Sequence, residues 1–160
     1  MQKIIIIFTV VLIILALPWP GAAMSNLNPL KACTFSEMQI SLFFDGKPAT
    51  GAKITRTIEW RKEHVDEFTA DGNGQVTLPA EFENYYLKFF PMEFVSAQFL
   101  TVQYEGKEYE IWNYAKRKTE LNSEMDGEPL KLSCELTSES ITTRAFGSIL
   151  GTRCTLPQES

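Results

Sequence analysis

The sequence contains few of the residues that metal sites and catalytic centres usually require. Its 160 residues include a single histidine, His64, and three cysteines, and no Cys-x-x-Cys pair occurs. Structural zinc sites need four ligands of these two kinds, usually in closely spaced pairs. We therefore expect neither a bound metal nor a cofactor, and we expect the protein not to be an enzyme.

Long apolar runs are also scarce, since the sequence has only one, at its start. Residues 4–24 carry no charge, Lys3 precedes them, and Gly21-Ala22-Ala23 offers the small residues of a cleavage site. This pattern predicts a signal peptide over residues 1–23 and a periplasmic or secreted protein. Because about 20 uncharged residues can cross a bilayer as a helix, an uncleaved inner-membrane anchor, with the domain outside the cytoplasm, is the alternative.

Positive charge is in the minority. The chain has 15 basic and 20 acidic side chains and a net charge of −5 at pH 7, and cleavage would remove one basic residue, Lys3. An acidic chain is poorly suited to bind nucleic acid or anionic lipid through general charge attraction. We expect no nucleic-acid partner, a membrane contact only through an uncleaved N-terminus, and a protein partner outside the cytoplasm.

Helical periodicity is missing as well, and strand patterns take its place. Short segments alternate between apolar and polar residues, and turn signals such as Asp45-Gly46 and Asp126-Gly127 separate them. The alternating segments cover residues 38–44, 52–60, 76–82, 97–104, 108–114 and 130–136. Regular short strands of this kind predict an all-β fold, an antiparallel Ig-like or prealbumin-like sandwich of about 7–8 strands.

These patterns divide the chain into a signal segment over 1–23, a sandwich domain over 33–136 and a Ser/Thr-rich C-terminal tail over 137–160. The tail is either packed onto the sandwich through Cys154 or loose. Within the strand predicted at 52–60, Arg56 falls on the apolar face. We therefore expect this strand at a sheet edge, or with an inward face that is partly wet.

The cysteines predict one disulfide, because two of the three should pair in an oxidising compartment. Alternation places Cys134 on the inward face of its strand. We favour a Cys33–Cys134 bond, which would tie the N-terminal lead-in to the last strand. Cys134–Cys154, which would hold the tail, is the alternative. The remaining cysteine would be free or would bridge to another chain.

Two segments resemble a known family of sandwich domains. Residues 45–54 read DGKPATGAKI and residues 68–79 read FTADGNGQVTLP. Together they resemble the carboxypeptidase regulatory-like, or transthyretin-like, pattern G-x-P-x-x-G-A-x-V followed by T-D-x-x-G-x-F-x-L, with Ala70 and Val76 as departures. Residues 104–112, YEGKEYEIW, are similar to a group of uncharacterised exported bacterial proteins. The resemblance covers about 35 residues and implies a fold but no mechanism.

Candidate catalytic and metal-binding residues are weak. His64 and Asp66 share a strand face and Ser148 is a conceivable nucleophile, but residues 147–151 do not form the strained nucleophile elbow that such a serine needs. We interpret His64 as a surface histidine. Residues 71–75 open like a calcium loop, yet Phe82 stands where an EF-hand needs glutamate, so we predict a turn.

Two aromatic-basic clusters are the candidate protein-binding residues, because tryptophan, tyrosine and arginine anchor many interfaces. Each cluster ends a predicted strand, and the two would form one rim if both strands ended at the same end of the sandwich. The alternative is that the tryptophans lie in the core and the lysines in solvated turns. The candidates are Trp60, Arg61 and Lys62, with Trp112, Tyr114, Lys116, Arg117 and Lys118.

The function that these features favour is binding. We expect a non-enzymatic exported binding module that recognises another protein in the periplasm or envelope, such as an immunity protein that neutralises a secreted toxin. The alternative is a membrane-anchored structural or carbohydrate-binding envelope protein. An enzyme is the least expected class, because no residue set selects a reaction.

Overall fold

The computed structural model describes residues 30–86 and 92–156, so the predicted signal peptide over 1–23 lies outside the described residues. The regular structure within them is β-strand, apart from short 3-10 turns such as Ser123–Met125 and Ala145–Gly147. No helix in these two ranges is long and apolar enough to cross a membrane. The prediction of an all-β protein is confirmed.

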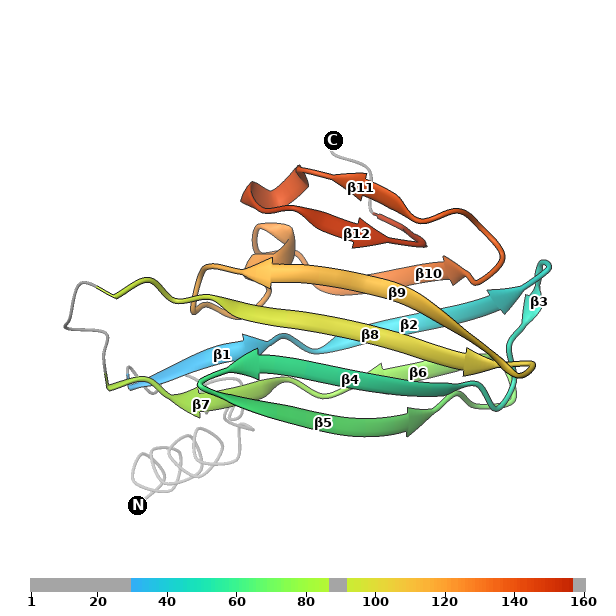
Figure 1. The fold of residues 1–160 in the computed structure, drawn as a ribbon, viewed down its shortest axis with the longest axis horizontal. Coiled ribbons are helices and arrows are strands. Elements are labelled where there is room, and N and C mark those ends of the chain that lie inside the picture. Colours follow the sequence, from blue (N-terminus) through green and yellow to red (C-terminus); the bar gives the residue numbers. More distant parts are fainter. Residues whose placement is uncertain (1–29, 87–91, 157–160) are drawn as a thin grey trace, which may run out of the picture.

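The larger sheet has six strands, and every neighbouring pair in it is antiparallel. In spatial order they are β11 (Ile141–Thr143), β12 (Leu150–Thr152), β9 (Lys107–Lys116), β8 (Ser96–Tyr104), β4 (Lys53–Trp60) and β5 (Lys62–Thr69) (Figure 1). The β8–β9 hairpin turns at Glu105-Gly106, where both residues have positive φ.

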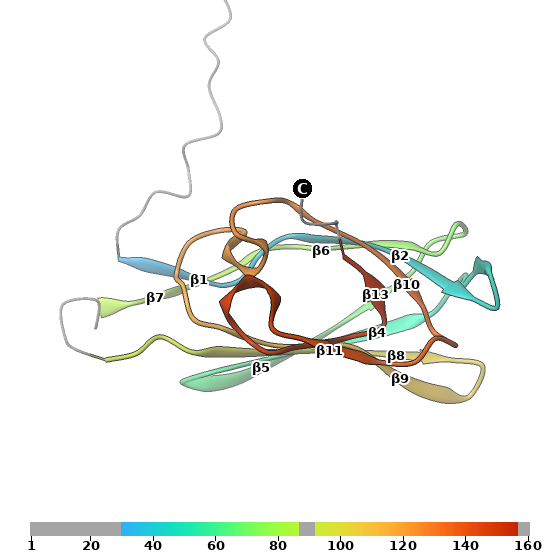
Figure 2. The same ribbon diagram turned by 90° about the horizontal axis from the view of Figure 1, so that it is seen from above.

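The second sheet has five strands and packs face to face with the first, as the edge-on view in Figure 2 shows. A separate two-stranded sheet extends one end of this layer. The second sheet contains β13 (Cys154–Thr155), β10 (Leu130–Glu135), β2 (Met38–Phe44), β3 (Lys47–Pro48) and β6 (Gln75–Leu78), and the two-stranded one contains β1 (Lys31–Phe35) and β7 (Glu81–Asn84).

The core lies between the two layers and is filled by the inward-facing residues of both. Ile40 and Leu132 come from the second sheet, and Ile54, Leu100 and Trp112 come from the first. All five are at most 3% exposed. The alternation of apolar and polar residues therefore identified the inward faces of these strands correctly.

The strand number and one pairing direction differ from the prediction. The described residues contain thirteen strands, several of only two or three residues, where about 7–8 were predicted. β2 and β10 pair in parallel, from Met38 opposite Leu130 to Phe43 opposite Glu135. A period-2 pattern has the same appearance for either direction, so the sequence could not distinguish them.

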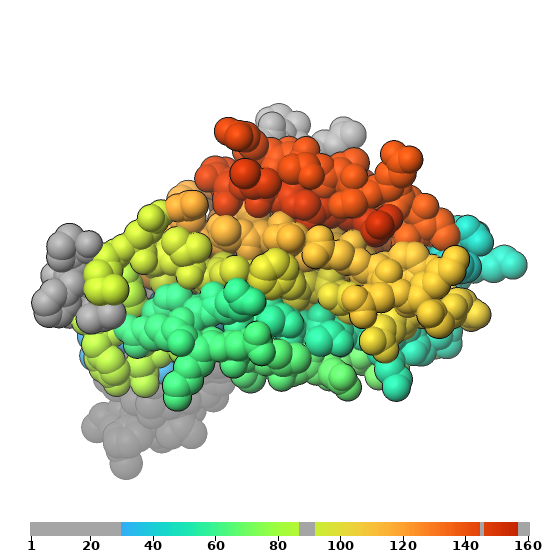
Figure 3. Space-filling view, viewed as in Figure 1, coloured from blue at the N-terminus to red at the C-terminus, as the bar shows by residue number. Residues whose placement is uncertain are grey.

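The C-terminal segment is packed onto the sandwich rather than loose. β12 pairs with β9, and β13 pairs with β10. Figure 3 shows this segment, in orange and red, as a continuous flank beside β9. The disulfide joins Cys134 to Cys154, which lie opposite each other in the β10–β13 pair. The favoured Cys33–Cys134 pairing is wrong, because Cys33 on β1 is a free, buried thiol.

Arg56 occupies neither an edge strand nor a wet face, so that prediction is also wrong. β4 lies between β5 and β8, and the Arg56 side chain is fully buried. Its guanidinium donates to Asp66, Glu81 and the carbonyl of Pro79. It also lies over the ring of Phe35, with its Cζ 4.7 Å from the ring centroid. These partners replace the water that a buried cation loses.

Candidate functional site

The two aromatic-basic clusters lie at the same end of the molecule. β4 and β9 are each antiparallel to β8, which separates them, so both run in the same direction. Figure 1 shows their arrowheads at the same end of the sheet. The turn after Trp60 and the segment after Lys116 therefore lie at the same end of the sandwich.

The aromatic members of these clusters are core residues. Trp60 is 8% exposed and packs against Tyr85 and Phe94, with ring centroids 5.7 and 5.4 Å away. Trp112 is 0% exposed and Tyr114 is 3% exposed. These side chains stabilise the fold and offer no surface to a partner, as the alternative interpretation held.

Lys116 is buried as well, although it belongs to the predicted basic cluster. Its Nζ lies 2.6 Å from Oε2 of Glu124 and 3.0 Å from Oγ of Ser36. Trp112, Tyr114 and Lys116 alternate along β9 and so share its inward face. The side chain of Lys116 therefore belongs to the interior and cannot meet a partner.

The Glu124 carboxylate is the centre of a buried polar network. It accepts hydrogen bonds from the Ser36 amide and hydroxyl, at 3.0 and 2.7 Å, and from Nε2 of Gln98 at 2.9 Å. The Cys33 thiol lies 3.5 Å from the Ser36 hydroxyl, and burial raises its pKa against the opposing effect of Lys116. A serine in contact with a lysine can serve as a nucleophile and its base. Here both Ser36 and Lys116 are 0% exposed, so no substrate can reach them, and we interpret the network as structural.

The other predicted basic residues are on the surface of this end. Arg61 is exposed, with its Cζ 4.5 Å from the Trp60 ring centroid, and it donates to the carbonyl of Asn84. Lys62 is also exposed. Arg117 forms an exposed ion pair with Glu93.

Lys118 completes this set, and its Nζ lies 3.5 Å from the carboxylate of exposed Asp126. Arg61, Lys62, Arg117 and Lys118 therefore remain as residues that a partner could contact, and we call them the basic end.

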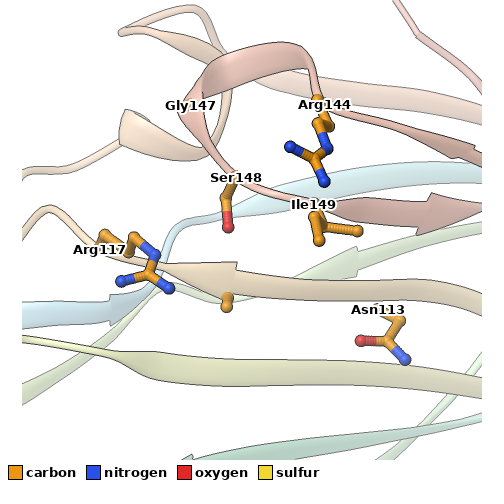
Figure 4. Close-up of a pocket in the computed structure, with 7 residues that line it drawn as sticks. Asn113, Arg117, Arg144, Gly147, Ser148 and Ile149 are labelled. Carbon is orange, nitrogen blue, oxygen red and sulfur yellow. The ribbon is translucent and has the colours of Figure 1, made fainter.

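A surface groove of about 640 Å³ adjoins the basic end. Its floor comes from the last part of β9 and its wall from the loop before β12 (Figure 4). The groove forms because β12 starts at Leu150, opposite Tyr114, whereas β9 continues to Lys116. Its lining residues are Asn113, Ala115, Arg117, Arg144, Gly147, Ser148 and Ile149.

The loop that forms the wall is held in a defined shape. The Tyr114 hydroxyl donates to the carbonyl of Phe146 at 3.1 Å, and Phe146 has a φ of 60°. Burial first, and then the carboxylates of Glu124 and Asp126, raise the pKa of Tyr114 to about 12. This hydroxyl therefore remains a donor at any physiological pH.

The sequence did not identify the wall of the groove. Arg144 lies in a segment without alternation or a motif, so no pattern related it to Arg117. Ser148 was considered only as a nucleophile, and the structure separates it from His64. Ser148 precedes β12, near one edge of the six-stranded sheet, whereas His64 lies on β5 at the other edge.

A second polar cluster surrounds His64, which is exposed as predicted. Possible ligand atoms of His64, Asp66 and Glu81 lie within 4.8 Å of one another. However, Nη2 of Arg56 already contacts Asp66 Oδ2 and Glu81 Oε1. A second cation would be repelled there, so we interpret the cluster as an ion-pair network that holds Arg56.

The segment predicted as a turn at residues 71–75 is one. Oδ1 of Asp71 accepts hydrogen bonds from the backbone amides of Asn73 and Gln75, both at 2.8 Å. An aspartate that binds the amides of following residues is a common way to close a turn.

Comparison with known proteins identifies a family but no activity. No curated protein and no solved structure matches the chain. The family model that matches covers residues 38–139, from β2 to just beyond β10, and leaves the wall of the groove outside the match. It is not the carboxypeptidase regulatory-like family that residues 45–79 resemble. Since the match covers more than half of its length, the chain belongs to the family described as Domain of unknown function (DUF6795).

Proposed function

We propose that the protein is a non-enzymatic binding module, exported from the cytoplasm, that recognises another protein. The observation that carries this proposal is the basic end, which gathers Arg61, Lys62, Arg117 and Lys118 on a chain of net charge −5. Charged groups placed together on one end of a protein increase the association rate and orient the partner. Arginine is also among the residues that contribute most to interfaces.

The state of these side chains supports a binding role. Trp60 and the Asn84 carbonyl hold the Arg61 guanidinium in place before any partner arrives. Preordering of this kind reduces the entropy lost on binding. The ion pairs of Arg117 and Lys118 are exposed and can be exchanged for a partner's carboxylates at little cost.

The concrete form that we propose is an immunity protein, which would neutralise a secreted toxin by covering its active cleft. The predicted signal peptide over residues 1–23 supports a periplasmic or secreted location for this interaction. We also propose that residues 45–79 are a distant variant of the carboxypeptidase regulatory-like sandwich, because their turns and strands follow its pattern. The carbohydrate-binding alternative loses support, since Trp60 and Trp112 are both buried.

The test is an affinity pull-down of the full chain, with a C-terminal tag, from its native extracytoplasmic fraction. The test variant is Arg61→Glu/Arg117→Glu, and the matched control is Lys47→Glu/Lys107→Glu, which changes exposed lysines away from the basic end. Circular dichroism and urea unfolding would show that both variants fold.

We expect one stoichiometric partner that the wild type and the control capture and the test variant loses. The proposed function would be overturned by the absence of a partner, or by a partner that all three proteins capture equally. A toxin as the captured protein would establish the immunity role.

A further inference from the structure

We propose that the groove between β9 and residues 144–149 binds an extended acidic segment of the partner protein, with Arg117 and Arg144 as the contacts to its carboxylates. This inference rests on the proposed function and names the chemistry of the partner at a defined place. Three features of the groove carry it: open space beside the end of β9, two guanidinium groups that line or border that space, and a preformed wall.

The first feature is the open space beside the end of β9. Ala115 and Lys116 pair with Ala97 and Ser96 of β8 on one side. On the other side the pairing with β12 stops at Tyr114, opposite Leu150, and no strand of the described ranges continues it. Beyond this point the loop before β12 and the end of β9 enclose an open groove, in which a segment of another chain can lie.

The second feature is the charge. Figure 4 shows Arg117 and Arg144 on either side of the Ser148 side chain. Arg144 is exposed and makes no ion pair within the described part of the chain, and the Arg117–Glu93 pair is open to solvent. Guanidinium groups bind carboxylates through paired hydrogen bonds. A carboxylate of the partner could therefore pair with Arg144 without displacing another group. At Arg117 it would have to compete with Glu93.

The third feature is the shape of the wall and its apolar contribution. The bond from Tyr114 to the Phe146 carbonyl fixes the loop, so little order has to be created on binding. Ile149 lines the groove and is 55% exposed. A segment that contains both acidic and apolar residues would therefore find contacts for both kinds in the groove, the arginines and Ile149.

The test uses the full chain and a defined probe, an eight-residue peptide of alternating glutamate and valine labelled with fluorescein. Peptides in which glutamine or lysine replaces glutamate are the controls. Fluorescence anisotropy would measure affinity, and amide NMR shifts would locate the site. The variants are Arg144→Gln and Arg117→Gln, with Lys47→Gln, on an exposed lysine at the far end of the sandwich, as the matched control.

We expect the glutamate peptide to shift the amides of residues 113–117 and 147–149. We expect each arginine variant to bind it about tenfold more weakly or worse, since a hydrogen bond to a charged group is worth at least that factor. The inference is overturned if millimolar peptide gives no shift, if the three peptides bind equally, or if Lys47→Gln weakens binding as much as the arginine variants.

The pull-down separates this inference from the proposed function. A partner that Arg144→Gln retains but Arg61→Glu/Arg117→Glu loses would leave the function standing and overturn the groove as its site. If no partner is captured, the proposed function fails, and the peptide titration alone decides whether the groove recognises carboxylates.

Discussion

Nζ of Lys116 lies 2.6 Å from Oε2 of Glu124, and solvent reaches neither side chain. Two charges removed from water in this way are tolerated only when other groups complete their hydrogen bonds, as Ser36 and Gln98 do here. The pair connects the end of β9 to the turn Ser123–Met125, and so holds the segment between them.

Breaking this pair should be costly. We expect Lys116→Met or Glu124→Gln to lower the free energy of unfolding by about 3–5 kcal/mol, because each leaves a buried charge without its partner. The double variant Lys116→Met/Glu124→Gln should cost less than the sum of the two single changes. Urea unfolding measures all three. The control is Lys118→Met, in an exposed pair, which should change the free energy of unfolding by no more than about 0.5 kcal/mol. If the double variant lost as much as the two single variants combined, the prediction would be contradicted.

Loss of the disulfide should destabilise the protein moderately. Cys134 and Cys154 are separated by 20 residues, and closure of a loop of that length reduces the entropy of the unfolded chain. We expect Cys134→Ala/Cys154→Ala to lower the free energy of unfolding by about 3 kcal/mol. Alkylation of the denatured, unreduced wild type should label Cys33 alone. Labelling of Cys154 would show that the Cys134–Cys154 bond is absent. The control is Cys33→Ala, which removes the free thiol and leaves the disulfide intact.

The hydrogen bonds of Arg56 should make stability depend on the planar shape of its guanidinium as well as on its charge. We expect Arg56→Met to cost about 3 kcal/mol or more, since Asp66, Glu81 and the Pro79 carbonyl lose their common donor. Arg56→Lys should recover little of this loss, because one ammonium cannot reproduce the planar fork. Thermal unfolding checks both variants. Full recovery by lysine would mean that charge alone, without the fork, satisfies these acceptors.

Gly74 and Gly46 form a matched pair for measuring a steric clash. Both have positive φ, at 72° and 73°. A Cβ at Gly74 would lie 2.5 Å from the Leu42 carbonyl oxygen, whereas a Cβ at Gly46 would meet nothing within 4 Å. We expect Gly46→Ala to cost about 1–2 kcal/mol from backbone strain alone. Gly74→Ala should cost about 1–3 kcal/mol more, because its Cβ would also clash with the Leu42 carbonyl oxygen. Equal losses of unfolding free energy for the two variants would contradict this close approach of Gly74 to β2.

Glu135 should make stability depend on pH in the acid range. Burial tends to raise the pKa of Glu135, but hydrogen bonds from Thr137, Gly46 and Asp45 outweigh it and hold the pKa below its ordinary value. A carboxyl whose folded pKa is depressed stabilises the protein above its unfolded pKa, about 4.3, and this stabilisation disappears as pH falls through the folded pKa.

The measurement is urea unfolding of the wild type and Glu135→Gln between pH 7 and pH 3. We expect the wild type to be the more stable protein at neutral pH and the difference to shrink below about pH 4.3. The matched control is Glu139→Gln, whose carboxylate is exposed and accepts no hydrogen bond in the described ranges. A difference that stays constant with pH would contradict the role of the Glu135 carboxylate.

Local patterns predicted the strands well and their partners poorly. Alternation placed Ile40, Leu132 and Cys134 on inward faces, where they are. It could not show that β2 and β10 pair in parallel, nor that Cys154 would lie opposite Cys134. Both depend on contacts between distant segments, which a period of two residues does not encode.

The same limit explains the incomplete prediction of the site. Lys116 follows Trp112 and Tyr114 at the spacing of an inward face, so the signal for its burial was present in the sequence. Nothing local identified Glu124 as its partner, because that residue lies in a segment without periodicity. Arg144 was missed for a related reason. It becomes a groove residue only because the pairing of β12 with β9 ends at Tyr114, and no local pattern shows where that pairing ends.

The parallel pair has a consequence for the order in which the chain can assemble. β6 is synthesised early and covers one edge of β2, but the other edge stays open until β10 is made, because residues 45–129 separate β2 from β10. Contacts so distant in the chain form slowly, and a bare strand edge in the meantime is a template for aggregation. A nascent or truncated chain that stops at β9 leaves one edge of β2 uncovered. We therefore expect its tendency to self-associate to fall once residues 130–135 have paired with that edge.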